Sequence, residues 1–170
     1  DLPSQSHRAN VVVVTKCPTH MQPIDRRIVS NTLQLASYQH LFYSSIGYAP
    51  IHLNGTPLIV TGIANPMPLL THLQQQYPDT ELLAYPDHHI FTPQDVNRIM
   101  QKAEQYVCVV TTEKDYMRLL QTPLVEQLGD KLHVISIQTN LGIDKEAFDR
   151  QILLYVSENN RTKPNITTLQ

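Results

Sequence analysis

The sequence predicts an α/β fold in which a parallel sheet of about four strands is flanked by helices. Short apolar, β-branched runs alternate with segments that have the apolar spacing of helices, which is the pattern of repeated strand–helix–strand units. The strand candidates are also continuously apolar, as expected for strands buried on both faces of a parallel sheet. A chain of 170 residues suits one domain, or one domain together with a piece of another.

The regular part of the pattern begins after an Asn-Gly turn signal at residues 54–55. The strands of the sheet are expected at residues 57–62, 81–85, 107–110 and 132–137. Helices are expected at residues 66–76, 93–103, from 112 onward, and 144–156. We expect Asn65, Thr92 and Thr112 to cap the first three of these helices, because Asn and Thr side chains accept hydrogen bonds from free helix amides.

The N-terminal part has a different pattern. Residues 10–16 predict a strand buried on both faces, and a helix is expected at about residues 23–38. Residues 41–55 are aromatic and β-rich but interrupted by Gly and Pro, which favours an irregular or edge strand, or a hinge between two domains. The α/β domain is therefore expected at residues 56–156, and a polar tail at 157–170.

Composition excludes several classes of protein. Hydrophobic residues make up 41% of the chain, which excludes a wholly disordered protein, and the net charge of −2 argues against a non-specific nucleic-acid binder. Two cysteines outside any CxxC pair favour buried thiols in a reducing compartment over a disulfide framework or a zinc site. The sequence contains no membrane-spanning run, no signal-peptide pattern and no initiator Met, so we expect it to be part of a longer protein.

Polar residues gather at the ends of four predicted strands, and in open parallel sheets ligands bind beyond the carboxyl ends of the strands. The Asp87-His88-His89 run could bind a metal or move protons, or its histidines could simply cap neighbouring backbone. At the end of an earlier strand, Gly62 would allow close backbone approach, and the helix amides after Asn65 could meet an anion. The alternative there is a plain tight turn with a helix cap.

The other two strand ends carry basic residues. Lys114 and Arg118 could form a basic pair for a phosphate, or they could be solvated charges on a helix whose acidic residues serve as caps. Thr15 and Lys16 end the first buried strand, where a lysine often extends harmlessly to solvent. The chain has no G-x-x-x-x-G-K-[ST] sequence, so a Walker loop has no support.

In series, these stretches resemble the C-terminal part of the tetraacyldisaccharide 4′-kinases, the lipid A kinases of Gram-negative bacteria. Singly each stretch is weak, but four in order at this spacing are specific, and the resemblance covers roughly residues 8–156. The matching stretches are Arg8–Lys16, Thr61–Pro66, Pro86–His89 with Phe91-Thr92, and Thr111–Asp115 with Arg118-Leu119.

The resemblance implies an enzyme that transfers the γ-phosphate of ATP, with Mg²⁺, to the 4′-hydroxyl of a tetraacylated disaccharide 1-phosphate. Such enzymes have two α/β domains and work at the cytoplasmic face of the inner membrane. Their N-terminal domain carries the Walker loop, the magnesium ligands and a catalytic Asp, and its N-terminal region contacts the membrane. Residues 1–40 would be the remnant of that P-loop NTPase-like domain, and residues 41–55 part of the linker. The chain alone would be soluble and inactive, and would hold no cofactor tightly.

The resemblance also implies residue roles. His88 would be a catalytic base that pairs with the catalytic Asp of the other domain, and Asp87 would orient it. The residues implied to bind substrate or phosphate are Gly62, Asn65, His89, Lys114 and Arg118. Thr15 and Lys16 would lie near the nucleotide, and no residue of this chain is expected to bind a metal.

Two other functions are compatible with the residues. A metal-dependent phosphoesterase could use the Asp87-His88-His89 run, but its further ligands would have to be Glu113 and Asp115. A non-catalytic module that binds a nucleotide or a lipid is the second alternative.

Overall fold

The computed structural model describes residues 3–161, which form two compact units. Unit 1 contains the described residues up to Gly47 together with those from Thr139 onward, and unit 2 is Tyr48–Gln138. The chain therefore passes from one unit to the other twice. These bounds differ from the expected domain bounds at the C-terminal end, because residues 139–161 belong to unit 1.

Unit 2 contains the predicted parallel sheet. Its strands are β3 (Pro57–Thr61), β4 (Glu81–Ala84), β5 (Cys108–Thr112) and β6 (Leu132–Ile135). They lie in the order β4-β3-β5-β6, and every neighbouring pair is parallel. The prediction of four parallel strands with flanking helices is thus confirmed.

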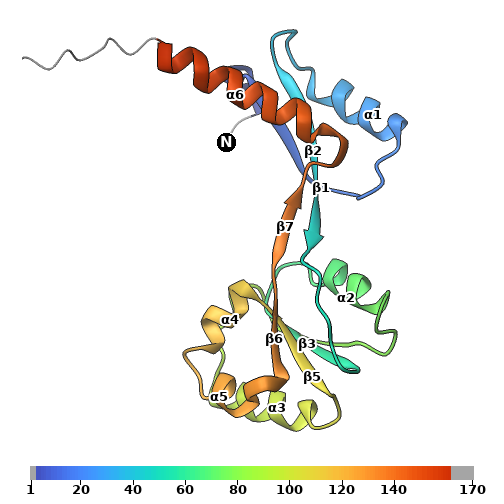
Figure 1. Cartoon of the computed structure of the whole chain (residues 1–170), viewed down its shortest axis with the longest axis vertical. Coiled ribbons are helices and arrows are strands. Elements are labelled where there is room, and N and C mark those ends of the chain that lie inside the picture. Colours follow the sequence, from blue (N-terminus) through green and yellow to red (C-terminus); the bar gives the residue numbers. More distant parts are fainter. Residues whose placement is uncertain (1–2, 162–170) are drawn as a thin grey trace, which may run out of the picture. The chain divides into compact units, whose positions relative to one another are not determined.

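Helices cover both faces of this sheet (Figure 1). They are α2 (Met67–Gln74), α3 (Pro93–Ala103), α4 (Glu113–Leu119) and α5 (Leu124–Leu128), and a short 3₁₀ turn, η2, follows at Gly129–Lys131. One apolar cluster joins the sheet to α3, α4 and α5, and a second joins it to α2 and to the segment before β3.

Side chains of β3 alternate between these two clusters. Leu58 and Val60 pack towards α3, α4 and α5, whereas Ile59 packs towards α2, and all three side chains are fully buried. Complete burial of each such side chain contributes about 1.5–3 kcal/mol. This explains why the continuously apolar run of the sequence forms a central strand rather than an edge strand.

The strand order places a topological switch point between β3 and β5. From β3 the chain crosses to β4 on one side, and it then returns to β5 on the other side of β3. In open α/β sheets, the crevice at the carboxyl ends of two such strands is where ligands bind. Thr61 and Thr112 end these two strands.

Unit 1 has a separate sheet of order β1-β2-β7, in which β1 and β2 are parallel. Its elements are η1 (Pro3–Arg8), β1 (Val11–Cys17), α1 (Pro23–Leu33), β2 (His40–Tyr48), β7 (Ile137–Asn140), η3 (Gly142–Asp144) and α6 (Lys145–Arg161). The last residue of β2, Tyr48, and the first residues of β7, Ile137 and Gln138, are assigned to unit 2. Residues 11–14 thus lie outside the four-stranded sheet, which agrees with the α/β domain expected at residues 56–156. An Arg26–Asp144 ion pair of 2.9 Å joins α1 to η3, and Phe42 meets Phe148 of α6 edge to face.

Several sequence expectations for unit 1 were wrong. The strand β1 has no fully buried residue, and Val13 is 37% exposed, so β-branched character alone did not indicate burial. Helix α1 ends at Leu33, because Gln34 adopts a left-handed conformation that stops the helix. Residues 40–48 form a regular nine-residue strand, not an irregular one.

The C-terminal expectations also needed correction. Helix α5 was not predicted, because five residues are too few to show a periodic pattern. The expected strand at 132–137 breaks at Ser136 into β6 and β7. Helix α6 continues to Arg161, so the expected polar tail begins inside a helix, and its residues 162–170 lie outside the described part of the chain.

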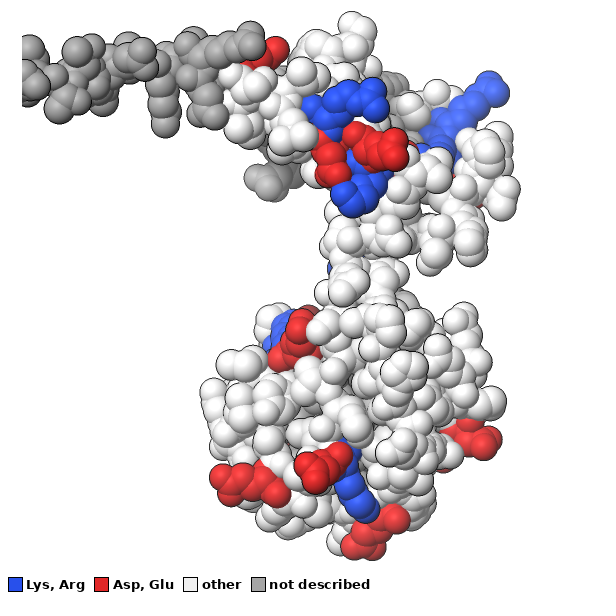
Figure 2. Space-filling model, viewed as in Figure 1, with Lys and Arg blue, Asp and Glu red and all other residues white. Residues whose placement is uncertain are grey.

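Charged side chains are sparse on the surface. Acidic and basic groups lie interspersed on the face drawn in Figure 2, and most of that face carries neither. Within residues 3–161, no helix combines the length and the apolar character that crossing a membrane requires.

Candidate functional site

A polar cluster lies at the switch point of unit 2, where β3 and β5 end. It combines residues from the loop after β3, the loop after β4 and the first turns of α4. The cluster consists of Thr61, Gly62, Asp87, His88, Thr112, Lys114, Asp115 and Arg118, and we call it the switch-point cluster.

Asp115 is the centre of this cluster and is completely buried. Its Oδ2 atom accepts hydrogen bonds from the Thr61 hydroxyl at 2.5 Å, the Gly62 amide at 3.0 Å and the Thr112 hydroxyl at 2.9 Å. Its Oδ1 atom accepts from Nη1 of Arg118 at 2.9 Å. A buried carboxylate is tolerated only when its oxygens are satisfied in this way, so Asp115 ties together the ends of β3 and β5.

Gly62 is required where it stands because other atoms approach it closely. A Cβ atom at this position would lie 3.0 Å from the backbone oxygen of Pro86 and 3.4 Å from Cβ of His89. The loop after β3 therefore packs directly against the loop that carries the histidines. The group that approaches Gly62 most closely is the backbone oxygen of Pro86.

Arg118 connects the buried carboxylate to the exposed histidine. Its Nη1 atom also donates to the backbone oxygen of Gly62 at 3.3 Å, and its Nη2 atom lies 3.2 Å from Nδ1 of His88. The Arg118 side chain is 21% exposed, whereas that of His88 is 73% exposed. The imidazole of His88 is therefore exposed to solvent, and the more buried guanidinium group of Arg118 contacts it.

His88 also has a strained backbone. Its φ of 61° is left-handed, a conformation that costs of order 1–3 kcal/mol for a non-glycine residue and that clusters at functional sites. The backbone amide of His88 donates to Oδ1 of Asp87 at 3.0 Å. The loop thus fixes His88 through both its main chain and its ring.

Asp87 pairs with Lys114 more closely than with the ring of His88. Nζ of Lys114 donates to Oδ1 of Asp87 at 3.1 Å, whereas Oδ2 of Asp87 lies 3.6 Å from Nε2 of His88. The Lys114 hydrogen bond lowers the pKa of Asp87 from its ordinary value. Lys114 and Arg118, which we expected to meet a phosphate, both have carboxylate partners in this structure.

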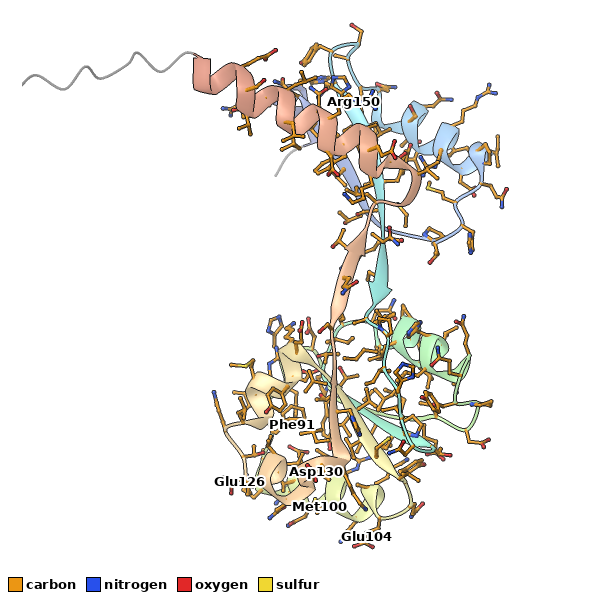
Figure 3. The ribbon with its side chains drawn as sticks, viewed as in Figure 1. Phe91, Met100, Glu104, Glu126, Asp130 and Arg150 are labelled. Carbon is orange, nitrogen blue, oxygen red and sulfur yellow. The ribbon has the colours of Figure 1, made fainter. Side chains whose placement is uncertain are left out.

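His89 points away from this cluster into a second network. Its ring stacks on Tyr85 at 4.7 Å and meets Phe91 edge to face, and Phe91 is labelled in Figure 3. Its Nε2 atom lies 2.9 Å from Oδ2 of Asp95, which also accepts from the amide and the hydroxyl of Thr92. Burial raises the pKa of Asp95, but the hydrogen bonds from Thr92 and His89 outweigh it and hold the pKa at about 2.

The helix caps were partly predicted. Thr92 and Thr112 cap α3 and α4, and each accepts from the amide three residues on. Asn65 is exposed and is not the cap of α2, which begins at Met67 after Pro66. Pro66 takes the N-cap position instead, and its carbonyl oxygen accepts a hydrogen bond from the Leu70 amide at 3.1 Å.

Thr15 and Lys16 belong to unit 1, whereas the switch-point cluster belongs to unit 2. Both are exposed, and they form an irregularity near the end of β1, where Lys16 has a left-handed φ of 59°. The next residue, Cys17, lines a cavity of about 330 Å³ that also involves Arg26, Tyr43 and Ser44. The Ser44 hydroxyl is buried without a hydrogen-bond partner among the described residues.

Metal binding finds no support among the residues that the structure describes. No group of three or more His, Cys, Asp or Glu side chains in that part of the chain is arranged to hold an ion. The two further ligands that a phosphoesterase would need are engaged elsewhere, Asp115 as described above and Glu113 with the hydroxyl of Ser136 at 2.7 Å.

A cavity of about 280 Å³ lies in unit 2, at the amino-terminal edge of the sheet and opposite the switch-point cluster. Met100, Glu104 and Asp130 contribute to its lining, and Figure 3 places these labels at the end of unit 2 away from α4. None of the site residues predicted from the sequence lines it.

Sequence reasoning missed the buried hydrogen-bonding role of Asp115, which was considered only as a capping acid or a metal ligand, and it did not single out Asp95. For Asp115 a signal was available, because it lies three residues after the continuously buried strand β5 and three residues after the capping Thr112. No sequence signal distinguishes the inward ring of His89 from the outward ring of His88.

Comparison with known proteins is consistent with these features. A family model described as tetraacyldisaccharide-1-P 4′-kinase matches residues 1–157. Curated relatives named tetraacyldisaccharide 4′-kinase include proteins of Bacteroides thetaiotaomicron, 32% identical over 91% of this chain and 48% of its own length, and of Phocaeicola vulgatus, 34% identical over the same shares. A third, from Flavobacterium johnsoniae, is 33% identical over 92% of this chain and 47% of its own length.

The chain spans about half the length of the curated relatives it matches. The family match extends through both units, from η1 to most of helix α6. The chain therefore belongs to the tetraacyldisaccharide-1-P 4′-kinase family.

Proposed function

We propose that this chain forms part of an enzyme that transfers the γ-phosphate of ATP to the 4′-hydroxyl of a tetraacyldisaccharide 1-phosphate. The reaction belongs to lipid A biosynthesis and would take place at the cytoplasmic face of the inner membrane of a Gram-negative bacterium. The observation that carries the proposal is the family match over residues 1–157, which includes the whole switch-point cluster. The lipid A disaccharide precursor is then the substrate.

Within this proposal, His88 is the residue that meets the reacting groups, and Asp87 positions its loop. Phosphoryl transfer depends mostly on positioning and on stabilising charge, so a fixed imidazole at the edge of a sheet is useful there. The strained backbone and the exposed ring of His88 support this role. His89 supports the loop from inside, since its ring packs against both Tyr85 and Phe91.

Four other residues are proposed to line the substrate side of the cluster. Gly62 allows the two loops to pack together, and exposed Asn65 lies beyond it at the start of α2. Lys114 and Arg118 carry positive charge next to His88, and an incoming phosphate would compete with Asp87 and Asp115 for them.

The described residues do not fit the phosphates of ATP or a magnesium ion. The chain contains no Walker sequence, and its described residues offer no metal cluster. We propose that ATP and Mg²⁺ are bound mainly by the part of the relatives that this chain does not match, which also includes the region that contacts the membrane.

Residues 1–40 are proposed to belong to that nucleotide-binding domain, with Thr15 and Lys16 near the nucleotide and residues 41–55 as the linker. The cavity beside Cys17, at the carboxyl end of β1 and next to Tyr43 and Ser44 of β2, supports this assignment. Exposed apolar residues of unit 1, such as Ile24, Ile28 and Leu153, are consistent with further protein covering it.

The proposal is tested with a complete kinase that carries this chain, supplied with labelled ATP, Mg²⁺ and the tetraacyldisaccharide 1-phosphate. Label should appear at the 4′ position, and His52→Ala should leave the rate unchanged, because His52 is exposed and is not a member of the switch-point cluster. Release of phosphate from phosphoesters, with bound Mn²⁺ or Zn²⁺, would instead favour a phosphoesterase. Binding of ATP or lipid without turnover would favour a binding module.

A further inference from the structure

We propose that Arg118 is a positioning residue that holds the neutral imidazole of His88 in the form that carries its proton on Nε2. His88 then meets its ligand as a hydrogen-bond donor and not as a base. The assignment of the tautomer depends only on the geometry of unit 2, whereas its catalytic meaning rests on the proposed function.

The chemistry of the 3.2 Å contact fixes the direction of the hydrogen bond. A guanidinium group has only donors, so Nη2 of Arg118 must donate and Nδ1 of His88 must accept. A neutral imidazole whose Nδ1 atom accepts carries its hydrogen on Nε2. The lone pair of Nδ1, which His88 would need in order to act as a base, therefore accepts the hydrogen bond from Arg118.

Arg118 can serve as a fixed donor because it is anchored on its inner side. Its Nη1 atom donates to buried Asp115 and to the backbone oxygen of Gly62. The other oxygen of Asp115 is held by three donors from two strand ends, so the carboxylate cannot turn away. A chain of hydrogen bonds thus runs from the ends of β3 and β5 through Asp115 and Arg118 to the imidazole of His88, and it fixes the position of that ring.

The opposite side of the ring agrees with this tautomer. Oδ2 of Asp87, an acceptor, lies 3.6 Å from Nε2, which is too long for a hydrogen bond but places negative charge near the N–H group. Nε2 is consequently left as a donor on a ring that is 73% exposed. A carboxylate or a phosphoryl oxygen would be a suitable acceptor for it.

The test uses the 170-residue chain labelled with ¹⁵N at histidine, at about pH 8, where an ordinary imidazole is neutral. The nitrogen signals of His88, assigned by their loss in His88→Gln, should show Nδ1 as an acceptor and Nε2 as protonated. The share of the Nε2–H form should exceed that of exposed His52, whose ring forms no hydrogen bond in the described structure. Equal shares for the two histidines, or a proton on Nδ1 of His88, would overturn the proposal.

Arg118→Lys is the variant that separates the two contacts of the guanidinium group. A lysine keeps a positive charge for Asp115, but its single nitrogen cannot serve Asp115 and His88 together. The two nitrogen signals of His88 should move towards each other as the tautomers mix, whereas Arg98→Met, at an exposed position on α3, should leave them in place. Unchanged signals in Arg118→Lys would contradict the proposal.

The catalytic meaning is tested separately in the complete kinase. Arg118→Lys should lower kcat about 10-fold to 100-fold, the range for partners that orient a functional histidine, with KM nearly unchanged. In a His88→Ala background the same change should have almost no further effect. Additive losses would show that Arg118 does not act through His88. If His88 is held in the Nε2–H form but the complete protein has no kinase activity, the positioning role of Arg118 would be supported and the proposed function would be contradicted.

Discussion

Asp115 and Arg118 form an ion pair of 2.9 Å in which the carboxylate is completely buried and the guanidinium is partly exposed. This pair joins the interior of unit 2 to the loop that carries His88. It lies between the carboxyl ends of β3 and β5, at the position where the strand order predicts a ligand site.

Asp115→Asn should destabilise unit 2 by about 3–5 kcal/mol, because it removes the charge that pairs with Arg118 and turns an amide group towards donors. Chemical denaturation, followed by hydrogen exchange of the β3 and β5 amides, measures the loss. Asp130→Asn, at an exposed position, should change the free energy of unfolding by no more than about 0.5 kcal/mol. Equal stabilities for the two variants would show that the buried carboxylate does not hold the strand ends together.

Gly62→Ala should destabilise the chain by about 1–3 kcal/mol, because the new methyl group would lie 3.0 Å from the backbone oxygen of Pro86. The loop that carries Asp87 and His88 would have to move. Thermal denaturation measures the effect, with Ala64→Ser, an exposed change in the same loop, as the control. A Gly62→Ala protein as stable as the parent, with unchanged His88 signals, would argue against close packing of the two loops.

The pH dependence of stability should include a contribution from Asp95. Its folded pKa of about 2 is lower than the ordinary value of 3.8, so its stabilising effect is complete above pH 3.8 and is lost as the pH falls towards 2. Asp95→Asn should cost about 1–3 kcal/mol at neutral pH and should make stability less dependent on pH below 4. Parallel acid-denaturation curves for parent and variant would contradict this assignment.

The sheet of unit 2 was predictable because its sequence signals agree with one another. Continuous apolar runs predicted β3 and β5, and a Thr that is followed three residues later by an Asp predicted the start of α3. The burial of β1 was not predictable in the same way, because burial depends on what covers a strand and not on its β-branched residues. The loop with Asp87 was located, but the contacts of Arg118 and Asp115 depend on tertiary packing between segments more than 20 residues apart in the chain.

The chain of 170 residues should not phosphorylate the disaccharide by itself, and ATP should raise its melting temperature little. The physical reason is that its sequence offers no Walker loop to cradle the β- and γ-phosphates. An assay with labelled ATP and a thermal-shift titration check these two expectations. Phosphate transfer by the isolated chain would show that the phosphate site lies within these residues.

The most direct test of the account compares His88→Ala with His89→Ala in the complete kinase by steady-state kinetics. His88→Ala should lower kcat by about 10²–10⁴-fold, the range for a residue that assists proton movement or charge stabilisation in the transition state, with a smaller change in KM. His89→Ala should cost much less, because its ring packs against Tyr85 and Phe91 and faces Asp95. A near-normal kcat for His88→Ala, with or without a crippled His89→Ala, would contradict the assignment of His88.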